Sequence, residues 1–444
     1  MFHVSKKIIM SGAIGNALET YDYVIWGLFS VHLSKEFLPP HSHLSDIFFL
    51  FFITYILRPI GSVIGGILAD QVGRKRVLTL SIFVMGICTS IVGLLPSYDR
   101  IGVISVFLLL FIRLIQVFSM GGEYISSISM LIESCDRSRR GYFGSWAAFG
   151  VNAGVFISSL VGALVLYLID INMLPIWGWR LAFLFSFITM LFGFWIRRSI
   201  PESLEFVTKN ARREKRTWNE IVNEACAVLK VQFFESLLVL FLVLFGVSTT
   251  ILIFIYAPIH MVTMNNIHST QSFIINSSSL FFLIILVPFF GFISDILGRI
   301  QTIRIGTVSL LILVIPYFNI LSSGTFSQIL LFHILIGIPC ACIFAVTPVF
   351  VTEIFPLSVR CSITNLIYSL AACLGGGLTP LIALKFGNSA QGRYIPSFIL
   401  VFLGVMSLSL LAIFMKRNKR TDNHLVLVKK SPDAKCNSLL SKFL

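Results

Sequence analysis

The chain has 444 residues, of which 56% are hydrophobic and 12% charged, with a formal net charge of +14 and a mean hydropathy of +0.91. A soluble domain carries about 25% charged residues, and a surface in water needs them, whereas a surface in lipid must avoid them. The composition therefore excludes a soluble enzyme and predicts a protein that crosses the membrane many times.

Apolar stretches of membrane-spanning length follow one another along the whole chain. They cover residues 11–34, 47–69, 77–95, 102–132, 142–168, 181–197, 234–260, 272–294, 305–322, 327–352, 361–385 and 395–415. We predict an all-α membrane protein of 12 transmembrane helices in two six-helix pseudo-symmetric bundles. The predicted parts are an N-terminal bundle 1–197, a cytoplasmic central loop 198–233, a C-terminal bundle 234–415 and a basic cytoplasmic tail 416–444.

Basic residues are distributed unevenly between the two sides of these spans. With a cytoplasmic N-terminus, 27 of the 34 Lys and Arg residues fall on cytoplasmic segments. This is the positive-inside bias that sets orientation. It predicts a multi-pass protein of a bacterial-type inner membrane with both termini cytoplasmic, and it explains the net charge without a nucleic-acid partner. The eight Cys lie in apolar or cytoplasmic segments, so we expect no disulfide.

The two halves of the chain repeat a loop motif. Asp70, Gly73 and Arg74 recur 225 positions later as Asp295, Gly298 and Arg299. A second pair of residues recurs at an offset of 220, and in both copies the Glu stands seven positions before the Arg. These residues are Glu133 with Arg140, and Glu353 with Arg360. An internal duplication of a six-helix unit explains both repeats.

These motifs carry a resemblance. The Gly-x-x-x-Asp-x-x-Gly-Arg-Lys loop at 66–75 is typical of the major facilitator superfamily, and the chain is similar to its metabolite:proton symporter branch, which includes proline/betaine, α-ketoglutarate, citrate and shikimate permeases. The pieces that match that branch are residues 15–23, 58–61, 113–123, 139–141, 177–180 and 198–203. Thr20 and Val117 depart from the branch, which usually has Trp and Gly there.

The resemblance implies that the repeated motifs form a gate. Asp70, Gly73, Arg74, Glu133, Arg140, Asp295, Arg299, Glu353 and Arg360 are the gating candidates. Ion pairs among them at cytoplasmic helix ends would latch the two halves, and transport would follow from rocking of the halves about a site between them.

Charged residues well inside the spans are candidates for function because charge in hydrocarbon is costly. The five are Glu19, Asp22, Arg58, Arg113 and Glu123, all in the first half. Asp22 and Arg58 lie near the middle of spans one and two, so an Asp22–Arg58 or Glu19–Arg58 pair is feasible. On span four, helical steps of 100° place Arg113, Gln116, Met120 and Glu123 on one polar stripe.

Three carboxylates face two guanidiniums in this set, so one carboxylate lacks a partner. Desolvation favours the neutral form of such a group, which suits a proton carrier. We predict proton coupling at Glu19, Asp22 or Glu123, and substrate binding by Arg58, Arg113 and Gln116, with Tyr21, Tyr23 and Trp26 as possible cradles for an ammonium group. Structural ion pairing and aromatic packing are the alternatives. His333 is interpreted as a hydrogen-bonded core residue.

The predicted function is proton-coupled uptake of a small carboxylate-bearing solute, such as proline/betaine or an organic acid, by alternating access. Two alternatives stay open, a proton-driven exporter of the same superfamily and a membrane sensor that does not transport. No metal cluster, nucleophile–base set or phosphate-binding loop points to an enzyme or a cofactor. The expected partners are protons, a solute and the lipid bilayer, and we expect a monomer.

Overall fold

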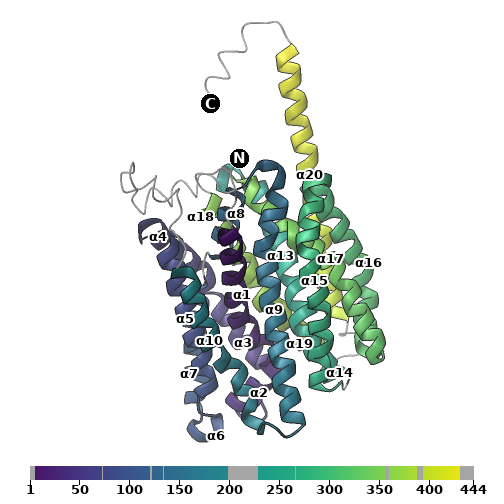
Figure 1. Ribbon diagram of the computed structural model, residues 1–444. Coiled ribbons are helices and arrows are strands. Elements are labelled where there is room, and N and C mark those ends of the chain that lie inside the picture. Colours follow the sequence, from purple (N-terminus) through teal and green to yellow (C-terminus); the bar gives the residue numbers. More distant parts are fainter. Residues whose placement is uncertain are drawn as a thin grey trace.

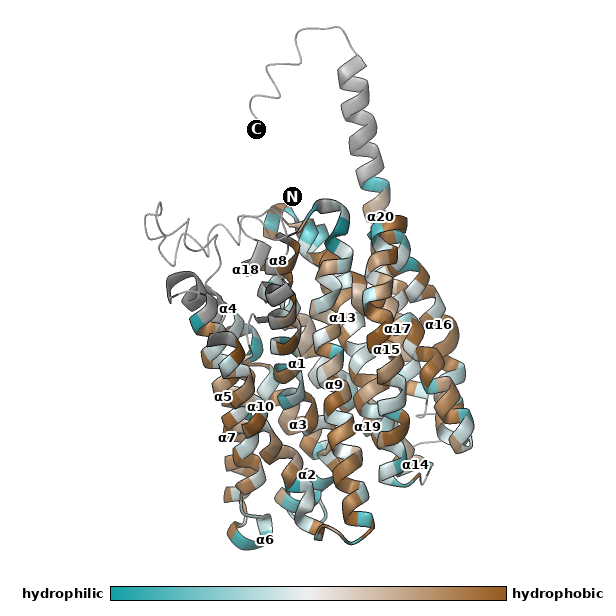
Figure 2. Ribbon diagram, in the orientation of Figure 1, coloured by the Kyte–Doolittle hydropathy of each residue, from teal (hydrophilic) through white to brown (hydrophobic). Residues whose placement is uncertain are grey.

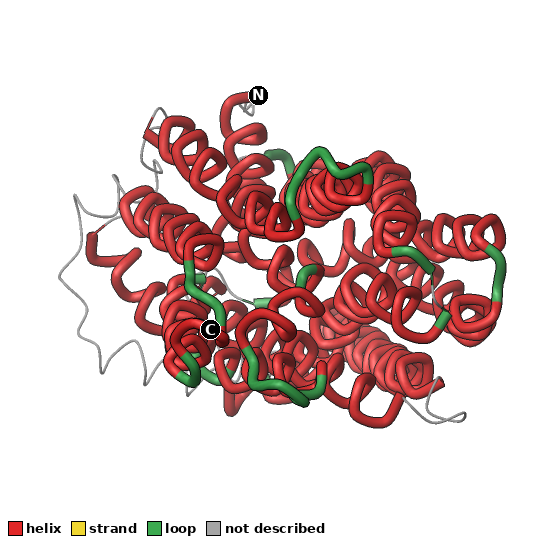
Figure 3. The backbone as a smooth tube through the Cα atoms, turned by 90° about the horizontal axis from the view of Figure 1, so that it is seen from below, coloured by secondary structure: helices red, strands yellow, loops and turns green. Residues whose placement is uncertain are grey.

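The computed structural model describes residues 6–72, 74–120, 123–133, 135–198, 229–265, 267–355, 360–387 and 394–430. Their regular structure is helical, and these ranges contain no strand (Figure 3). The start of α1 and the end of α20 lie at the same end of the bundle, the upper one in Figure 1, which we call the termini end. Helices α6 and α14 lie at the opposite end.

The first half of the chain supplies the elements up to α10. They are α1 (Lys6–Leu28), α2 (Ser30–Phe37), α3 (Leu44–Tyr55), α4 (Arg58–Val72), α5 (Arg74–Leu94), α6 (Tyr98–Ile101), α7 (Ile104–Ser119), α8 (Glu123–Glu133), η1 (Arg137–Arg139), α9 (Arg140–Asp170), η2 (Ile176–Trp179) and α10 (Arg180–Arg198).

The second half supplies the elements from α13 onward. They are α13 (Phe233–Ile251), η3 (Leu252–Tyr256), α14 (Ala257–Met264), α15 (Ser269–Leu297), α16 (Arg299–Ser323), α17 (Phe326–Ile354), α18 (Arg360–Ala372), η4 (Cys373–Leu378), α19 (Thr379–Gly387) and α20 (Ile395–Lys430). Helix α20 continues 15 residues past the predicted end of the last span at 415, so the described part of the tail is helical.

The helices have the length and composition of membrane spans. Within the described ranges, nine helical stretches are long and apolar enough to cross a bilayer, and two shorter apolar helices cover 79–94 and 104–119. The predicted first span is also helical, as α1 and α2, but it carries Glu19 and Asp22. Hydrophobic residues cover the middle of the bundle and hydrophilic ones gather near its ends (Figure 2). Each of the twelve predicted spans is therefore helical over most of its described residues.

Several spans are interrupted. Span two breaks between α3 and α4, and spans seven and eleven each contain a π-helical turn, η3 and η4. Each break is followed by a proline at the second position of the next helix: Pro59, Pro258 and Pro380. Proline has no backbone N–H, and Pro59 is tolerated because the first turn of α4 has no internal partner for such a group. Pro288 and Pro348 lie inside α15 and α17.

Span four is interrupted as well. Helix α7 ends at Ser119 and α8 begins at Glu123. Steps of 100° therefore place Arg113 and Gln116 on one buried stripe of α7, with Met120 directly after it, but they do not fix the direction of Glu123. The placement of Glu123 on the same stripe assumed one unbroken helix and stays a prediction.

Helix α9 packs along α1 in its own half and along α15 of the other half. The approach of α9 to α1 is close because glycines face it. A Cβ at Gly150 would collide with the Ala13 carbonyl oxygen, and one at Gly154 with the Ala17 carbonyl oxygen and with Thr20. Small residues four apart allow two backbones in a membrane to approach in this way. This packing holds Glu19 and Asp22, on α1, inside the first half.

We predict that Gly150→Ala destabilises the folded protein by about 1–3 kcal/mol, the usual cost of overpacking a tight contact, because the new methyl group meets backbone that cannot turn away. The measurement is thermal unfolding of the purified protein in detergent. Gly246→Ala is the matched control, since no atom lies within 4 Å of a Cβ there. It should be neutral or stabilising by up to about 1 kcal/mol, and equal losses in the two variants would contradict the packing argument.

Candidate functional site

Asp22 lies in the interior of the first half, where its side chain is 2% exposed. Its carboxylate oxygen Oδ1 is buried and accepts no hydrogen bond within the described part of the chain, which also offers Asp22 no ion pair. The Asp22–Arg58 pair that the sequence allowed is thus not formed in this structure. A carboxylate buried without a cation is strongly disfavoured, so this environment suits the neutral acid.

The backbone beside Asp22 is tied to the polar stripe of α7. Gln116 donates to the Asp22 carbonyl oxygen at 3.0 Å and to the Thr89 hydroxyl at 2.8 Å, and Arg113 donates to Gln116 Oε1 at 2.7 Å. Gln116 therefore connects α1, α5 and α7 through hydrogen bonds. Thr89 did not stand out in the sequence, because one Thr in an apolar helix carries no pattern.

The Arg113 guanidinium lies among aromatic rings. Its Cζ is 4.7 Å from the ring centroid of Trp26 and 5.2 Å from those of Tyr23 and Phe51. No carboxylate of the described residues is within ion-pair distance of it, and Arg113 is 3% exposed. Cation–π attraction, which strengthens on desolvation, takes the place of a salt bridge. Two of the three aromatic residues predicted to hold an ammonium group, Tyr23 and Trp26, thus hold a cation of the protein itself.

Arg58 is at the junction between the halves. It begins α4, directly after the break in span two, and is 8% exposed. Its guanidinium carbon lies 5.7 Å from the ring of Tyr23 on α1 and 5.8 Å from the ring of Tyr368 on α18. The π-helical turn η4 covers the same place, because Gly376 packs against Tyr55 and Tyr23. Of the two arginines, Arg58 is the one that contacts the second half.

Tyr21 and Trp26 face the interior of the first half. The Tyr21 hydroxyl donates to the Ala182 carbonyl oxygen of α10 and its ring packs on Phe185. Trp26 packs edge-on against Phe51 and Phe183. Glu19 on the same helix is buried. The side chain of Glu123 lies outside the described residues, and so do those of Asp70, Arg74, Glu133 and Arg360 and the whole of Gly73.

A cavity of about 70 Å³ lies between the two halves. Its polar lining comes from Tyr124 and Asn152 of the first half and from Thr250, Thr347 and Tyr368 of the second. Small-molecule sites usually measure about 300–1,000 Å³, so a solute needs more room than this cavity offers. Sequence reasoning did not select these residues, because hydroxyls and amides are common in buried helices. Tyr368 joins the cavity to Arg58, and Tyr124 packs on Tyr368 with ring centroids 5.3 Å apart.

At the termini end, Asp295 of α15 caps α9 of the other half. Its two carboxylate oxygens accept hydrogen bonds from the backbone N–H groups of Gly141 at 2.8 Å and Tyr142 at 2.9 Å. Arg139, the residue that precedes α9, provides no capping side chain, so a residue from the opposite half satisfies the first turn. A carboxylate at this position also interacts favourably with the helix dipole.

Ion pairs extend this contact between the halves. Arg299 lies 2.8 Å from Asp295 and 3.5 Å from Glu353, and Arg140 lies 3.7 Å from Glu353. The repeated motifs thus meet across the halves, with Arg140 of the first paired with Glu353 of the second. A Cβ at Gly141 would collide with Arg299, Ser294 and the Gly291 carbonyl oxygen, so only glycine fits.

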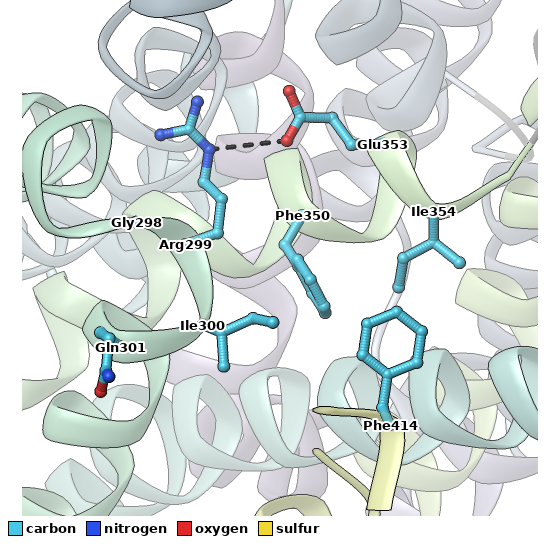
Figure 4. Close-up of a pocket in the computed structure, with 8 residues that line it drawn as sticks. All are labelled: Gly298, Arg299, Ile300, Gln301, Phe350, Glu353, Ile354 and Phe414. Carbon is cyan, nitrogen blue, oxygen red and sulfur yellow. Dashed lines mark ion pairs between the residues drawn. The ribbon is translucent and has the colours of Figure 1, made fainter. Parts of the chain in front are cut away.

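A larger cavity of about 470 Å³ lies beside this contact (Figure 4). Figure 4 shows the Arg299–Glu353 pair together with Phe350, Ile354 and Phe414 around the cavity. Its lining residues are Gly298, which precedes α16, and residues of α16, α17 and α20, all in the second half. It therefore does not lie between the halves and is not the candidate for a transport pathway.

Comparison with known proteins agrees with this architecture. The family model described as the Major Facilitator Superfamily matches residues 13–266 and 237–441. The glycine betaine/proline/ectoine/pipecolic acid transporter of Dickeya dadantii is 28% identical over 418 residues, which cover 93% of this chain and 83% of that protein. The proline/betaine transporter of Escherichia coli (strain K12) is 27% identical over 413 residues, covering 91% and 82%.

Solved structures resemble the chain in fold. The xylose transporter of E. coli in a partially occluded inward-open conformation gives a TM-score of 0.70 with 18% sequence identity, over 92% of this chain and 97% of that one. The proton:xylose symporter bound to 6-bromo-6-deoxy-D-glucose gives 0.69 with 18% identity, over 92% and 95%. At this identity, the likeness concerns the arrangement of the helices.

We predict that Asp295→Asn loosens the termini end, because a neutral side chain keeps one acceptor oxygen and loses its ion pair with Arg299. Backbone amides at the start of α9, those of Gly141 and Tyr142 above all, should exchange hydrogen faster, consistent with a loss of about 1.5–3 kcal/mol for a charged hydrogen bond. Hydrogen–deuterium exchange with mass spectrometry measures this. Asp136→Asn, at an exposed carboxylate nearby, should leave exchange unchanged, and the same change in both variants would refute the cap.

Proposed function

Because the chain belongs to the Major Facilitator Superfamily, we propose that it is a secondary active transporter that takes up a small carboxylate-bearing solute together with protons. The observation that carries this proposal is the pairing of two features in one half. Asp22 is a buried acid with no cation beside it, and Arg58 is a buried guanidinium cation at the junction with the other half. One suits a proton and the other suits an anion.

Asp22 is the proposed carrier of the proton. In this structure the surroundings of Asp22 accommodate the neutral acid, since the described part of the chain offers the carboxylate no ion pair. When water reaches the group, the carboxylate is solvated and the proton can leave. Glu19, three residues earlier on the same helix, and Glu123 are the further candidates.

The solute site is proposed at the cavity between the halves, with Arg58 as its anchor. A guanidinium binds a carboxylate through two parallel hydrogen bonds. Arg58 contacts the ring of Tyr368, and Tyr368 lines this cavity. The names of two relatives carry proline and betaine, and one of the two also carries ectoine and pipecolic acid. Each of these solutes has a carboxylate and a nitrogen cation, which suits an arginine with carboxylates and aromatic rings nearby.

Transport by alternating access requires the halves to rock about this cavity. The contacts of Asp295, Glu353 and Arg140 would hold the termini end closed and would break when it opens. The excess of Lys and Arg on the segments at this end supports a cytoplasmic location for it. We propose a bacterial-type inner membrane as the location, both termini in the cytoplasm, and a monomer as the functional unit.

The proposal is tested by uptake into proteoliposomes. Radiolabelled proline, betaine, α-ketoglutarate, citrate and shikimate are offered separately, with an acidic exterior and with equal pH on both sides. We expect one of these solutes to accumulate only when the pH gradient is present. Accumulation that requires the reverse gradient would point to a proton-driven exporter, and the absence of movement for any solute under either gradient would count against transport.

We predict that Asp22→Asn abolishes accumulation driven by the pH gradient but keeps exchange of solute for solute, because the amide binds no proton while the cavity is unchanged. The measurement compares gradient-driven uptake with counterflow in the same proteoliposomes. The control is Asp99→Asn, an exposed carboxylate on α6, which should behave as wild type. Normal accumulation by the Asp22 variant would transfer the role to Glu19 or Glu123.

We predict that Arg58→Lys raises KM for the solute about tenfold or more, because lysine keeps the charge but loses the two-point contact with a carboxylate. Initial rates of uptake over a range of solute concentrations measure it. Arg100→Lys, at an exposed position on α6, is the control and should leave KM unchanged. An unchanged KM in the Arg58 variant would remove Arg58 as the anchor.

A further inference from the structure

A single hydroxyl on α9 makes three hydrogen bonds with the opposite half. Ser159 Oγ donates to the Phe273 carbonyl oxygen at 3.2 Å and accepts from Asn276 Nδ2 at 3.2 Å and from Ser277 Oγ at 2.9 Å. All three partners lie on α15, and Ser159 is fully buried. Its one hydrogen and both lone pairs are used, so the hydroxyl is saturated.

The position of Ser159 separates this contact from the Asp295 cap. It lies 19 residues after Arg140 along α9, or about 28 Å at 1.5 Å per residue. The same two helices, α9 and α15, are thus joined at two depths, once near the termini end by a carboxylate and once deep in the bundle by neutral groups.

Asn276 has only one orientation that satisfies its neighbours. Its amide nitrogen donates to Ser159 Oγ and also to the Phe254 carbonyl oxygen in η3, at 3.1 Å. A carbonyl oxygen is only an acceptor, so a flipped amide would set two oxygens against each other. Both amide hydrogens are therefore committed, and Asn276 Oδ1 is left as an acceptor for a donor from the other side.

His333 supplies that donor. Its Nε2 lies 3.1 Å from Asn276 Oδ1, and its Nδ1 lies 2.7 Å from the hydroxyl of Tyr317. Since Oδ1 only accepts, Nε2 carries the hydrogen, and in a neutral imidazole Nδ1 then accepts from the Tyr317 hydroxyl. Tyr317, His333 and Asn276 are all buried, and each comes from a different helix, α16, α17 and α15.

We propose that His333 is a positioning residue of the transport cycle: through its tautomer, fixed by Tyr317, it orients Asn276 to latch the second half onto Ser159 of the first. The chain of hydrogen bonds runs in one direction, from Tyr317 through His333 and Asn276 to Ser159, and ends on the Phe273 carbonyl oxygen. When the end opposite the termini end opens, α9 separates from α15, and the hydrogen bonds from Asn276 to Ser159 and from Ser159 to the Phe273 carbonyl oxygen break. Tyr317, His333 and Asn276 stay together within the second half.

The inference rests on the rocking motion proposed above but not on the identity of the solute. It is tested by hydrogen–deuterium exchange of the full-length protein in nanodiscs without solute. Amides 269–277 of α15 and 160–170 of α9 report on the latch, and amides 291–297 report on the termini end.

Ser159→Ala removes the receiving hydroxyl and should speed exchange in the reporting segments about threefold to tenfold, the range expected for loss of a net hydrogen bond. Ser158→Ala is the matched control. Ser158 is equally buried, but its hydroxyl donates to the Tyr21 and Gly154 carbonyl oxygens within the first half. Its removal should leave those segments unchanged.

The two amide replacements of His333 separate positioning from packing. In His333→Gln, the longer side chain brings an N–H group to the place of Nε2 and should restore slow exchange. In His333→Asn, the amide reaches only the place of Nδ1, cannot donate to Asn276, and should exchange like the Ser159 variant. Tyr317→Phe keeps the ring and removes the hydroxyl that fixes the tautomer, so it serves as a second test where His333→Asn does not fold, and faster exchange is expected.

Wild-type exchange in both His333→Asn and Tyr317→Phe, or equal exchange in the Ser158 and Ser159 variants, would overturn the assignment. Exchange as fast in His333→Gln as in His333→Asn would also overturn it, because a residue that only fills space does not distinguish the two amides. Failure of every solute in the uptake experiment would remove the proposed function and leave this result in place, since exchange is measured without transport.

Discussion

Hydrocarbon offers no hydrogen-bond partner, so each polar group inside these helices must find one on another helix or lose its charge. The polar groups of the first half meet this requirement in different ways. Gln116 gives its hydrogens to α1 and α5, Arg113 lies among aromatic rings, and Asp22 keeps a carboxylate oxygen without a partner among the described residues. The Asp22 carboxylate is therefore the group that gains most from binding a proton.

The constraint also explains how the halves are joined. Helices α9 and α15 bear both an ionic and a neutral contact. The ionic one lies at the termini end, where water and headgroups can solvate Asp295, Glu353 and Arg140 once the halves separate. The neutral one at Ser159 lies deep in the bundle, where separated charges would be far more costly than separated hydroxyls and amides. Each contact thus suits the surroundings in which it has to break.

The interruptions of the spans lie where this chemistry is gathered. The break in span two brings Arg58 to the start of a helix, η4 packs its glycines against Tyr23 and Tyr55, and the η3 carbonyl of Phe254 accepts from Asn276. π-Helical turns are frequent at functional sites because they widen the backbone locally and change the direction of side chains. A regular helix would not present these groups to one another.

The sequence by itself determined the membrane class, the twelve spans and the two repeated halves, because hydrophobic length, charge placement and an internal offset are local features of a chain. It also singled out the buried charges, since charge in an apolar span stands out. Only the tertiary structure decided that Arg113 is held by aromatic rings, that Asp295 caps a helix of the other half, and that His333 reaches Ser159 through Asn276. These outcomes depend on which helices become neighbours and on how each side chain is oriented, and neither is set by the spacing of residues along one helix.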